Sequence, residues 1–320
     1  MAPGTRPEMP NAPRVGYLGP EGTFSEEALL ASAIPGAIEP CPLATIYDTI
    51  MALCRGEVDW AVVPIENSLD GSVSVTLDLL AEEAPNVEIV GEVLLRIRHS
   101  LIAGEPLVLD EIDTVLTHPQ VPGQCALFLR EELPHAQILP ASSTAEAVRI
   151  VAADRGTGRR PGRAALGTLL AAEIYGGTVL REGVEDRDDN ETRFVWLARA
   201  PRGAEGSESG QPPMRGAGAG EWKTSLVFWG PGAEHPGWLV RCLDEFARRG
   251  INLTRIESRP RRGRLGSYMF FADLGGSPTE TPVADAIAGV RGLCEEVRVL
   301  GSYRAGRDPR AQPARGTPGL

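Results

Sequence analysis

Short apolar runs alternate with helical stretches over residues 15–200, and this rhythm restricts the fold more than any other feature of the chain. Residues 15–18 and 60–65 are predicted strands, and Thr45 and Gly56 are placed to begin and end a helix between them. Such alternation is typical of an open α/β sheet. The extended stretch 87–99 is long enough to cross between two lobes, so we predict a two-lobed α/β region.

A cluster of Gly, Ser and Pro at residues 201–221 interrupts the rhythm and is a predicted linker. Beyond it we expect strand 225–229, helix 237–249, strands 252–259 and 267–274, helix 282–293 and strand 297–300. This βαββαβ order indicates a ferredoxin-like domain. The predicted organisation is a disordered leader (1–13), a two-lobed domain (14–200), the linker (201–221), the ferredoxin-like domain (222–303) and a disordered tail (304–320).

Composition excludes several classes of function. The formal charge of −11 opposes nonspecific binding to nucleic acid, and no apolar run reaches the length of about 18 residues that a membrane span needs. Five scattered cysteines and four histidines form no ligand spacing, so we expect neither disulfides nor a metal. The leader lacks the apolar stretch of a secretory signal, and we therefore expect a cytoplasmic protein.

A glycine-containing turn at residues 19–25 joins the first predicted strand to a helix. Backbone N–H groups at a helix start, with the hydroxyls of Thr23 and Ser25, suit a carboxylate or phosphate, and Ser25 is placed to cap the helix. The turn lacks the three spaced glycines of a dinucleotide-binding fingerprint, which argues against a nicotinamide or flavin cofactor. Taken alone, the segment favours a purely structural turn.

Three polar residues, Glu66, Asn67 and Ser68, follow the strand at residues 60–65. The carboxyl edge of an open α/β sheet is where such proteins bind ligands. Burial against Ile65 would favour the protonated form of Glu66, which makes it a candidate proton source. Capping of the next helix by Asn67 and Ser68 is the competing explanation.

Further polar groups stand at predicted helix starts in the second half of the region. Gln124 follows the segment Thr117-His118-Pro119-Gln120, and Ser143 and Thr144 begin a helix. Their amide, hydroxyl and N–H groups suit an anion, although routine capping also explains them. His118 beside a proline is best read as a structural hydrogen-bonding residue.

The last chemical segment combines a hydroxyl, a guanidinium and an aromatic ring at Thr192, Arg193 and Phe194. Arg193 is suited to grip a carboxylate with two hydrogen bonds, and Thr192 to donate one to a leaving oxygen. As an isolated tripeptide the segment carries little information. Its value comes from following the other four segments in a fixed order.

This ordered set resembles the monofunctional prephenate dehydratases, through Gly19-Pro20-Glu21-Gly22-Thr23-Phe24-Ser25, Pro64-Ile65-Glu66-Asn67-Ser68, His118-Pro119-Gln120, Thr192-Arg193-Phe194 and Glu257-Ser258-Arg259-Pro260. The resemblance runs from Val15 to about Ser302. It implies a catalytic region of two lobes similar to type II periplasmic binding proteins, with substrate between the lobes. It also implies a C-terminal ACT domain that binds phenylalanine at a subunit interface in a homodimer or homotetramer.

From this resemblance we expect decarboxylating dehydration of prephenate to phenylpyruvate, on the route to phenylalanine, without cofactor or metal. Thr192 carries the family's key role, with Glu66 and Asn67 as further catalytic candidates. The substrate-binding candidates are Thr23, Ser25, Ser68, Gln124, Ser143, Thr144, Arg193 and Phe194. The effector-binding candidates are Gly237, Leu239, Val240, Asn252, Leu253, Glu257, Ser258, Arg259 and Pro260.

Two departures from the family pattern and two other functions stay open. Trp238 stands where the family has alanine, so it would fill or reshape the effector site, and residues 121–123 before Gln124 are unusual. Arogenate is an alternative substrate, because the sequence does not reveal how the side-chain keto group is recognised. A two-lobed ligand sensor without chemistry is the other alternative, since fold alone does not fix function.

Overall fold

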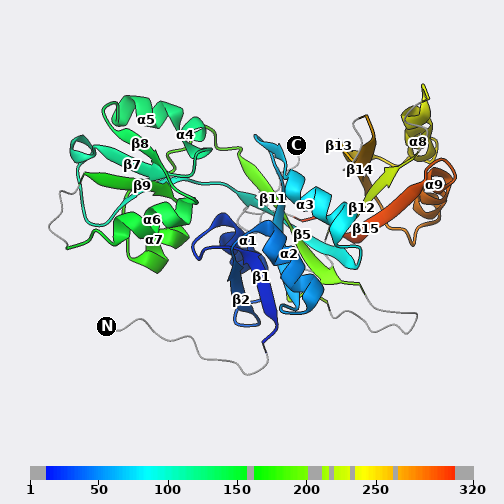
Figure 1. Ribbon diagram of the computed structural model, residues 1–320, viewed down its shortest axis with the longest axis horizontal. Coiled ribbons are helices and arrows are strands. Elements are labelled where there is room, and N and C mark those ends of the chain that lie inside the picture. Colours follow the sequence, from blue (N-terminus) through cyan, green and yellow to red (C-terminus); the bar gives the residue numbers. More distant parts are fainter. Residues whose placement is uncertain are drawn as a thin grey trace, which may run out of the picture.

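The computed structural model describes residues 12–156, 162–200, 211–215, 220–230, 235–261 and 266–306. It has two α/β lobes side by side and a C-terminal domain against the first lobe (Figure 1). Most of the predicted leader (1–13), linker (201–221) and tail (304–320) lies outside the described residues. No helix in the described part of the chain is both long and apolar enough to cross a bilayer.

Lobe 1 is built on a mixed sheet of strand order β2-β1-β3-β11-β5, with β4 paired to β3. β1 runs parallel to β2 and β3, whereas β11 runs antiparallel to β3 and β5. Its elements are β1 (Arg14–Leu18), α1 (Phe24–Ser32), β2 (Glu39–Leu43), α2 (Ile46–Arg55), β3 (Trp60–Asn67), β4 (Gly71–Ser72), α3 (Ser74–Asp78), the π-helical turn η1 (Leu79–Glu83), β5 (Val87–Arg96) and β11 (Glu191–Arg199).

Lobe 2 has a sheet of order β10-β6-β9-β7-β8. Its elements are β6 (Ser100–Ala103), the 3-10 turn η2 (Leu109–Glu111), β7 (Thr114–Thr117), α4 (Val121–Gln124), α5 (Ala126–Glu132), β8 (Gln137–Pro140), α6 (Thr144–Ala152), β9 (Arg163–Gly167), α7 (Leu169–Tyr175) and β10 (Thr178–Glu182). The chain crosses between the lobes after β5 and returns after β10, since β11 completes the first sheet. The predicted two-lobed α/β fold is confirmed.

Local capping chemistry sets both ends of α2 in the way the sequence predicts. Thr45 accepts a hydrogen bond from the Asp48 N–H at 3.0 Å, and Gly56 ends α2 in the left-handed region with φ 78°. At α1 the prediction was wrong by two residues. Thr23, not Ser25, is the N-cap, because Ser25 already lies inside the first turn.

The C-terminal domain comprises β12 (Trp222–Trp229), α8 (Trp238–Ala247), β13 (Leu253–Pro260), β14 (Tyr268–Gly275), α9 (Thr281–Arg291) and β15 (Glu296–Arg304). Its sheet is antiparallel in the order β13-β14-β12-β15, which confirms the ferredoxin-like prediction. Helices α8 and α9 cover one face of this sheet (Figure 1).

The other face of the C-terminal sheet packs directly on lobe 1. Val227, Phe271, Leu300 and Tyr303 belong to the same buried apolar cluster as Leu80 and other residues of η1, α2, β3 and β11. Because apolar area removed from water is the main stabilising term in folding, the two domains share a core instead of hanging on a linker. A displacement of the C-terminal sheet would therefore change the packing of side chains in lobe 1.

Candidate active site

Strand pairing divides the predicted catalytic residues into two groups. In the antiparallel pair β3–β11, Thr192 lies opposite Asn67, and Arg193 lies opposite Glu66. Successive side chains of a strand point to opposite faces of the sheet. Asn67 and Thr192 therefore share one face, and Glu66 and Arg193 share the other.

The Asn67 amide has a fixed orientation. Its Oδ1 accepts hydrogen bonds from the backbone N–H groups of Leu69 and Asp70, each at 2.8 Å. Because a backbone N–H can only donate, the opposite atom of the amide must be Nδ2, which donates to Thr192 Oγ1 at 2.9 Å and to Asn190 Oδ1 at 2.8 Å. Thr192 is an acceptor in this contact, so its own hydroxyl hydrogen remains able to donate elsewhere.

The same polarity continues into lobe 2 through Gln124. Asn190 Nδ2 donates to Gln124 Oε1 at 3.1 Å, and Gln124 Nε2 donates back to Asp70 Oδ2 at 3.3 Å. His99 Nε2 lies 3.0 Å from the same Oε1 and must be the donor, so the ring is protonated on Nε2. We call Asn67, Gln124, Asn190, Thr192 and His99 the amide network.

His99 is a buried member of the amide network. Only 1% of the residue is exposed, and its Nδ1 has no hydrogen-bond partner among the described residues. Burial lowers the pKa of His99, and the hydrogen bond to Gln124 opposes this only in part. The ring therefore remains neutral near pH 7, and its unprotonated Nδ1 is buried.

The lobes touch each other beside this network. Thr168 Oγ1 of lobe 2 donates to the Gly22 carbonyl of lobe 1 at 2.6 Å, and Tyr175 OH donates to the Glu21 carbonyl at 2.9 Å. Gly22 has φ +82°, and a Cβ there would lie 2.8 Å from Ala171 Cα, so only glycine fits this approach. Across the crossing segment, the Phe24 and His99 rings meet edge to face at 5.4 Å.

Other predicted substrate-binding residues make hydrogen bonds within the protein or are buried in it. Thr23 Oγ1 donates to the Leu18 carbonyl at 2.8 Å, and Ser68 joins the ends of β3 and β11 by accepting from the Glu191 N–H at 2.9 Å. Ser143 caps α6 by accepting from the Glu146 N–H at 3.0 Å, and Thr144 is the buried first residue of that helix. Ser25 is 4% exposed in the first turn of α1.

Glu66, Arg193 and Phe194 require a correction, because the structure does not bring them to Thr192. Arg193 is buried on the opposite face of β11, where its guanidinium contacts carboxylates at 2.6 Å, and Glu66 lies 3.3 Å from it. Phe194 points back to the face of Thr192 but is 2% exposed in the core beneath α1. A guanidinium held in this way has no free fork for a substrate carboxylate.

Comparison with known proteins supports the family that the ordered motifs indicate. The prephenate dehydratase family model matches residues 15–202. A prephenate dehydratase of Mycobacterium sp. (strain KMS) is 40% identical over 312 residues, which cover 94% of this chain and 92% of the relative. The chain belongs to the prephenate dehydratase family.

Solved structures agree over nearly the whole chain. A prephenate dehydratase of Arthrobacter aurescens in complex with L-Phe is 36% identical with a TM-score of 0.76, covering 95% of this chain and 93% of that one. A protein described as a novel type of quorum-quenching acylase is 29% identical with a TM-score of 0.76, covering 92% and 98%. Since one fold serves differently named proteins, the residues of the site must decide the reaction.

The residues that resemble the effector motifs of this family come from α8 and β13. Gly237 is the N-cap of α8 with φ 79°, and Val240 is 69% exposed, whereas Leu239 packs against the domain core. Trp238 is buried in that core between Phe228 and Phe270, with Nε1 donating to the Leu293 carbonyl at 2.8 Å. The tryptophan that departs from the family pattern thus fills the core of the domain.

Strand β13 is an edge strand of the C-terminal sheet, and its residues alternate between exposed and partly buried. Ser258 and Pro260 are exposed, and Glu257 is half-buried. Arg259 reaches lobe 1, where Nε and Nη2 donate to the Asp78 carboxylate at 3.1 and 2.8 Å. Asn252 accepts from the Gly275 N–H at 3.0 Å, and Leu253 packs on the core.

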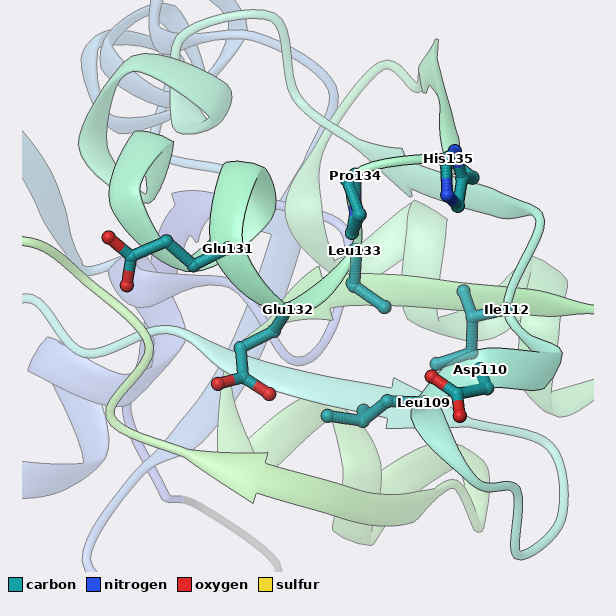
Figure 2. A pocket seen from close by; sticks show the side chains of 8 residues that line it. All are labelled: Leu109, Asp110, Ile112, Glu131, Glu132, Leu133, Pro134 and His135. Carbon is teal, nitrogen blue, oxygen red and sulfur yellow. The ribbon is translucent and has the colours of Figure 1, made fainter.

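A surface hollow of about 520 Å³ lies in lobe 2 between η2 and the end of α5 (Figure 2). Its lining residues are Leu109, Asp110, Ile112, Glu131, Glu132, Leu133, Pro134 and His135. None of these belongs to the amide network or to the predicted site.

Among the described residues, no group of three or more His, Cys, Asp or Glu side chains is arranged to hold a metal ion.

Sequence reasoning missed His99, Asn190 and Asp70 as members of the site. Asn190 stands two residues before Thr192, just ahead of the motif Thr192-Arg193-Phe194, and nothing in its position indicated its role. His99 lies where the chain crosses between lobes, just after β5. A polar residue at a predicted crossing between lobes is the signal that would have found it.

Proposed function

We propose that this chain is a carbon–oxygen lyase that converts prephenate into phenylpyruvate, carbon dioxide and water at the junction of its two lobes. In this reaction the bond between the ring and its carboxylate breaks, and its electrons make the ring aromatic. The bond between ring carbon and hydroxyl breaks at the same time, and hydroxide leaves. One proton is taken up to form water, so the site must supply a donor.

The observation that carries this proposal is the polarity of the amide network. Asn67 Nδ2 donates to Thr192 Oγ1, which leaves the Thr192 hydrogen to stabilise a departing hydroxide. A threonine hydroxyl is too weak an acid to be the final proton source, so Thr192 acts as a positioned hydrogen-bond donor. Gln124 and His99 hold the network together across the lobes, because the neutral His99 ring donates from Nε2 to Gln124 Oε1.

The substrate carboxylates need anchors other than Arg193. The N-terminal end of α6, with Ser143 and Thr144, supplies N–H groups and hydroxyls that favour an anion. The turn at Gly22 and Thr23 would supply the corresponding groups from lobe 1 by exchanging its present hydrogen bonds, from the Gly22 N–H to Glu26 and from the Thr23 hydroxyl to the Leu18 carbonyl. A dianionic substrate between these two helix starts would draw the lobes together, as their present contacts through Thr168 and Tyr175 do.

For the C-terminal domain we propose a regulatory role as an ACT domain that binds phenylalanine. A relative from Arthrobacter aurescens was solved in complex with L-Phe, and the exposed Val240 and the 46% exposed Ile256 on edge strand β13 suit a second copy of the chain. The assembly would then be a homodimer or homotetramer in the cytoplasm. Calorimetry with phenylalanine, together with the mass in solution with and without it, checks both parts.

Incubation of the purified protein with prephenate, followed by detection of phenylpyruvate, tests the proposed reaction. We expect turnover without added metal or cofactor, and a change in rate when phenylalanine is added. Turnover of arogenate but not of prephenate would identify an arogenate dehydratase. Binding of prephenate without product would identify a two-lobed sensor and overturn the proposed lyase.

A further inference from the structure

Arg193 joins the catalytic strand directly to two strands of the C-terminal domain and, through Glu92, to a third. Its Nη1 donates to Asp273 Oδ2 of β14 at 2.6 Å, and its Nη2 donates to Tyr303 OH of β15 at 2.7 Å. Its Nε donates to Glu92 Oε2 of β5 at 2.6 Å. Lys223 of β12 then holds the second oxygen of Glu92 at 2.6 Å.

The cluster around Arg193 is balanced in charge. Ser225 Oγ donates to Asp273 Oδ1 at 2.6 Å and lies 2.6 Å from Tyr303 OH, so both partners of the guanidinium are themselves held. Three cations face three carboxylates: Arg193, Lys223 and Arg255 against Glu66, Glu92 and Asp273. A planar guanidinium with five donors can satisfy several fixed acceptors together, which the single ammonium of lysine cannot do.

Burial alone would lower the pKa of Arg193, but Tyr303, Asp273 and Glu92 outweigh it and raise that pKa above its ordinary value. Burial likewise works to raise the pKa of Asp273, and the Arg193 charge and the Ser225 hydrogen bond reverse the effect. Arg193 is therefore permanently charged and cannot leave its partners without exposing buried carboxylates. Opening the contact between the domains at this point would therefore leave buried charges without partners.

We infer that Arg193 is a positioning residue, which fixes Thr192 relative to the C-terminal sheet and passes a displacement of that sheet to Thr192. The inference rests on the proposed reaction and adds a route for its control. Thr192 and Arg193 are neighbours on one strand, with side chains on opposite faces. A shift of Asp273 and Tyr303 moves the Arg193 backbone and hence the Thr192 hydroxyl beside Asn67.

An irregularity in strand pairing lies beside Thr192. The register between β11 and β3 shifts between Arg193 and Phe194, so on the β3 side the strand end that carries Thr192 is set off from the regular ladder, while pairing with β5 continues. Arg255 of β13 also reaches this end, where its Nη2 donates to Ser72 Oγ at 2.8 Å, but some interface contacts lie away from it. Arg298 of β15, for example, donates to the carbonyls of Leu80 and Ala81 in η1.

The test compares Arg193→Lys, Tyr303→Phe and Arg298→Lys by kcat and KM for prephenate. Tyr303→Phe removes one hydroxyl in the other domain, and we expect kcat to fall about 3- to 10-fold with KM within about twofold, because small misplacements of a catalytic group are costly. Arg193→Lys should lower kcat about 10-fold or more, again with little change in KM. Arg298→Lys, the matched interface control, should keep wild-type kcat.

Hydrogen exchange of the β11 amides provides a readout that does not depend on activity. Faster exchange at residues 191–194 in Tyr303→Phe, but not in Arg298→Lys, is expected. This result stands even if the wild-type protein proves inactive on prephenate, in which case the proposed reaction fails and the coupling does not.

Two results would overturn the inference. One is a KM raised about 10-fold or more in Arg193→Lys at unchanged kcat, which would return Arg193 to the role of substrate anchor. The other is a Tyr303→Phe variant with wild-type kcat and wild-type exchange of β11. If Arg193→Lys does not fold, Tyr303→Phe alone decides, because it removes a single oxygen atom.

Discussion

The two faces of strand β11 carry opposite kinds of chemistry. On one face, Thr192 belongs to a neutral network of amides and an imidazole, whose polarity leaves hydrogen-bonding capacity unused. On the other face, Arg193 belongs to a charged cluster in which its donors are taken up within the protein. A site for a ligand needs spare donors and acceptors, whereas a joint between domains needs them satisfied.

The largest expected effect concerns the charged face. Arg193→Leu leaves Glu92 and Asp273 buried without their main cation, and breaking a buried ion pair in this way costs about 3–5 kcal/mol. Urea unfolding monitored by circular dichroism measures the loss. Arg187→Leu is the control, since the Arg187–Asp189 pair is well exposed and its removal should leave stability nearly unchanged. Equal stability of both variants would contradict a charge-balanced cluster at Arg193.

The next largest expected effect concerns Thr192, on the face of β11 that carries the amide network. Thr192→Ala should lower kcat about 10²-fold or more, the usual loss for one catalytic donor, without a comparable loss of stability. Thr192→Ser retains the hydroxyl and should keep most of the activity. Steady-state kinetics with prephenate decide the matter, and a Thr192→Ala variant with near wild-type turnover would remove Thr192 from the mechanism.

The smallest effect is a pH dependence of stability from His99. The pKa of His99 is lowered by burial, whereas histidine in an unfolded chain has a pKa of about 6.5. Below that pH the unfolded chain binds a proton that the native ring resists, so the free energy of unfolding falls as the pH drops through the folded-state pKa. Above about pH 7 His99 adds no slope.

Denaturant titrations between pH 5 and 8 on the wild type and His99→Gln measure this contribution. The variant lacks the titrating ring and should show a shallower decline below about pH 6.5. Parallel curves for the two proteins would mean that His99 is not held neutral in the folded state.

Local chemistry allowed much of the fold to be predicted from the sequence. Thr45 and Gly56 bound their helix as expected, and Ser143 caps α6, because caps depend on a few neighbouring residues. The βαββαβ order of the C-terminal domain could also be predicted, because each element follows from the residues of its own segment. The prediction that Ser25 caps α1 was wrong. Two hydroxyls lie in that turn, and the helix begins directly after Thr23, which is therefore the N-cap.

The candidate site was predicted only in part. Asn67, Thr192 and Gln124 meet in one network, but Glu66 and Arg193 do not join them. Alternation along a strand already implied that neighbours such as Thr192 and Arg193 point apart. Which of the two faces the C-terminal domain covers depends on contacts more than 70 residues apart in the chain, and no local pattern encodes that choice.

A double-mutant cycle on kcat with Asn67→Ala and Thr192→Ala tests most directly whether the Asn67 amide sets Thr192 as a donor. The account predicts that each single variant loses about 10²-fold and that the double variant is little worse than Thr192→Ala alone, because both residues act as one unit. Losses that multiply in the double variant would contradict it, since Asn67 would then act on the substrate independently of Thr192.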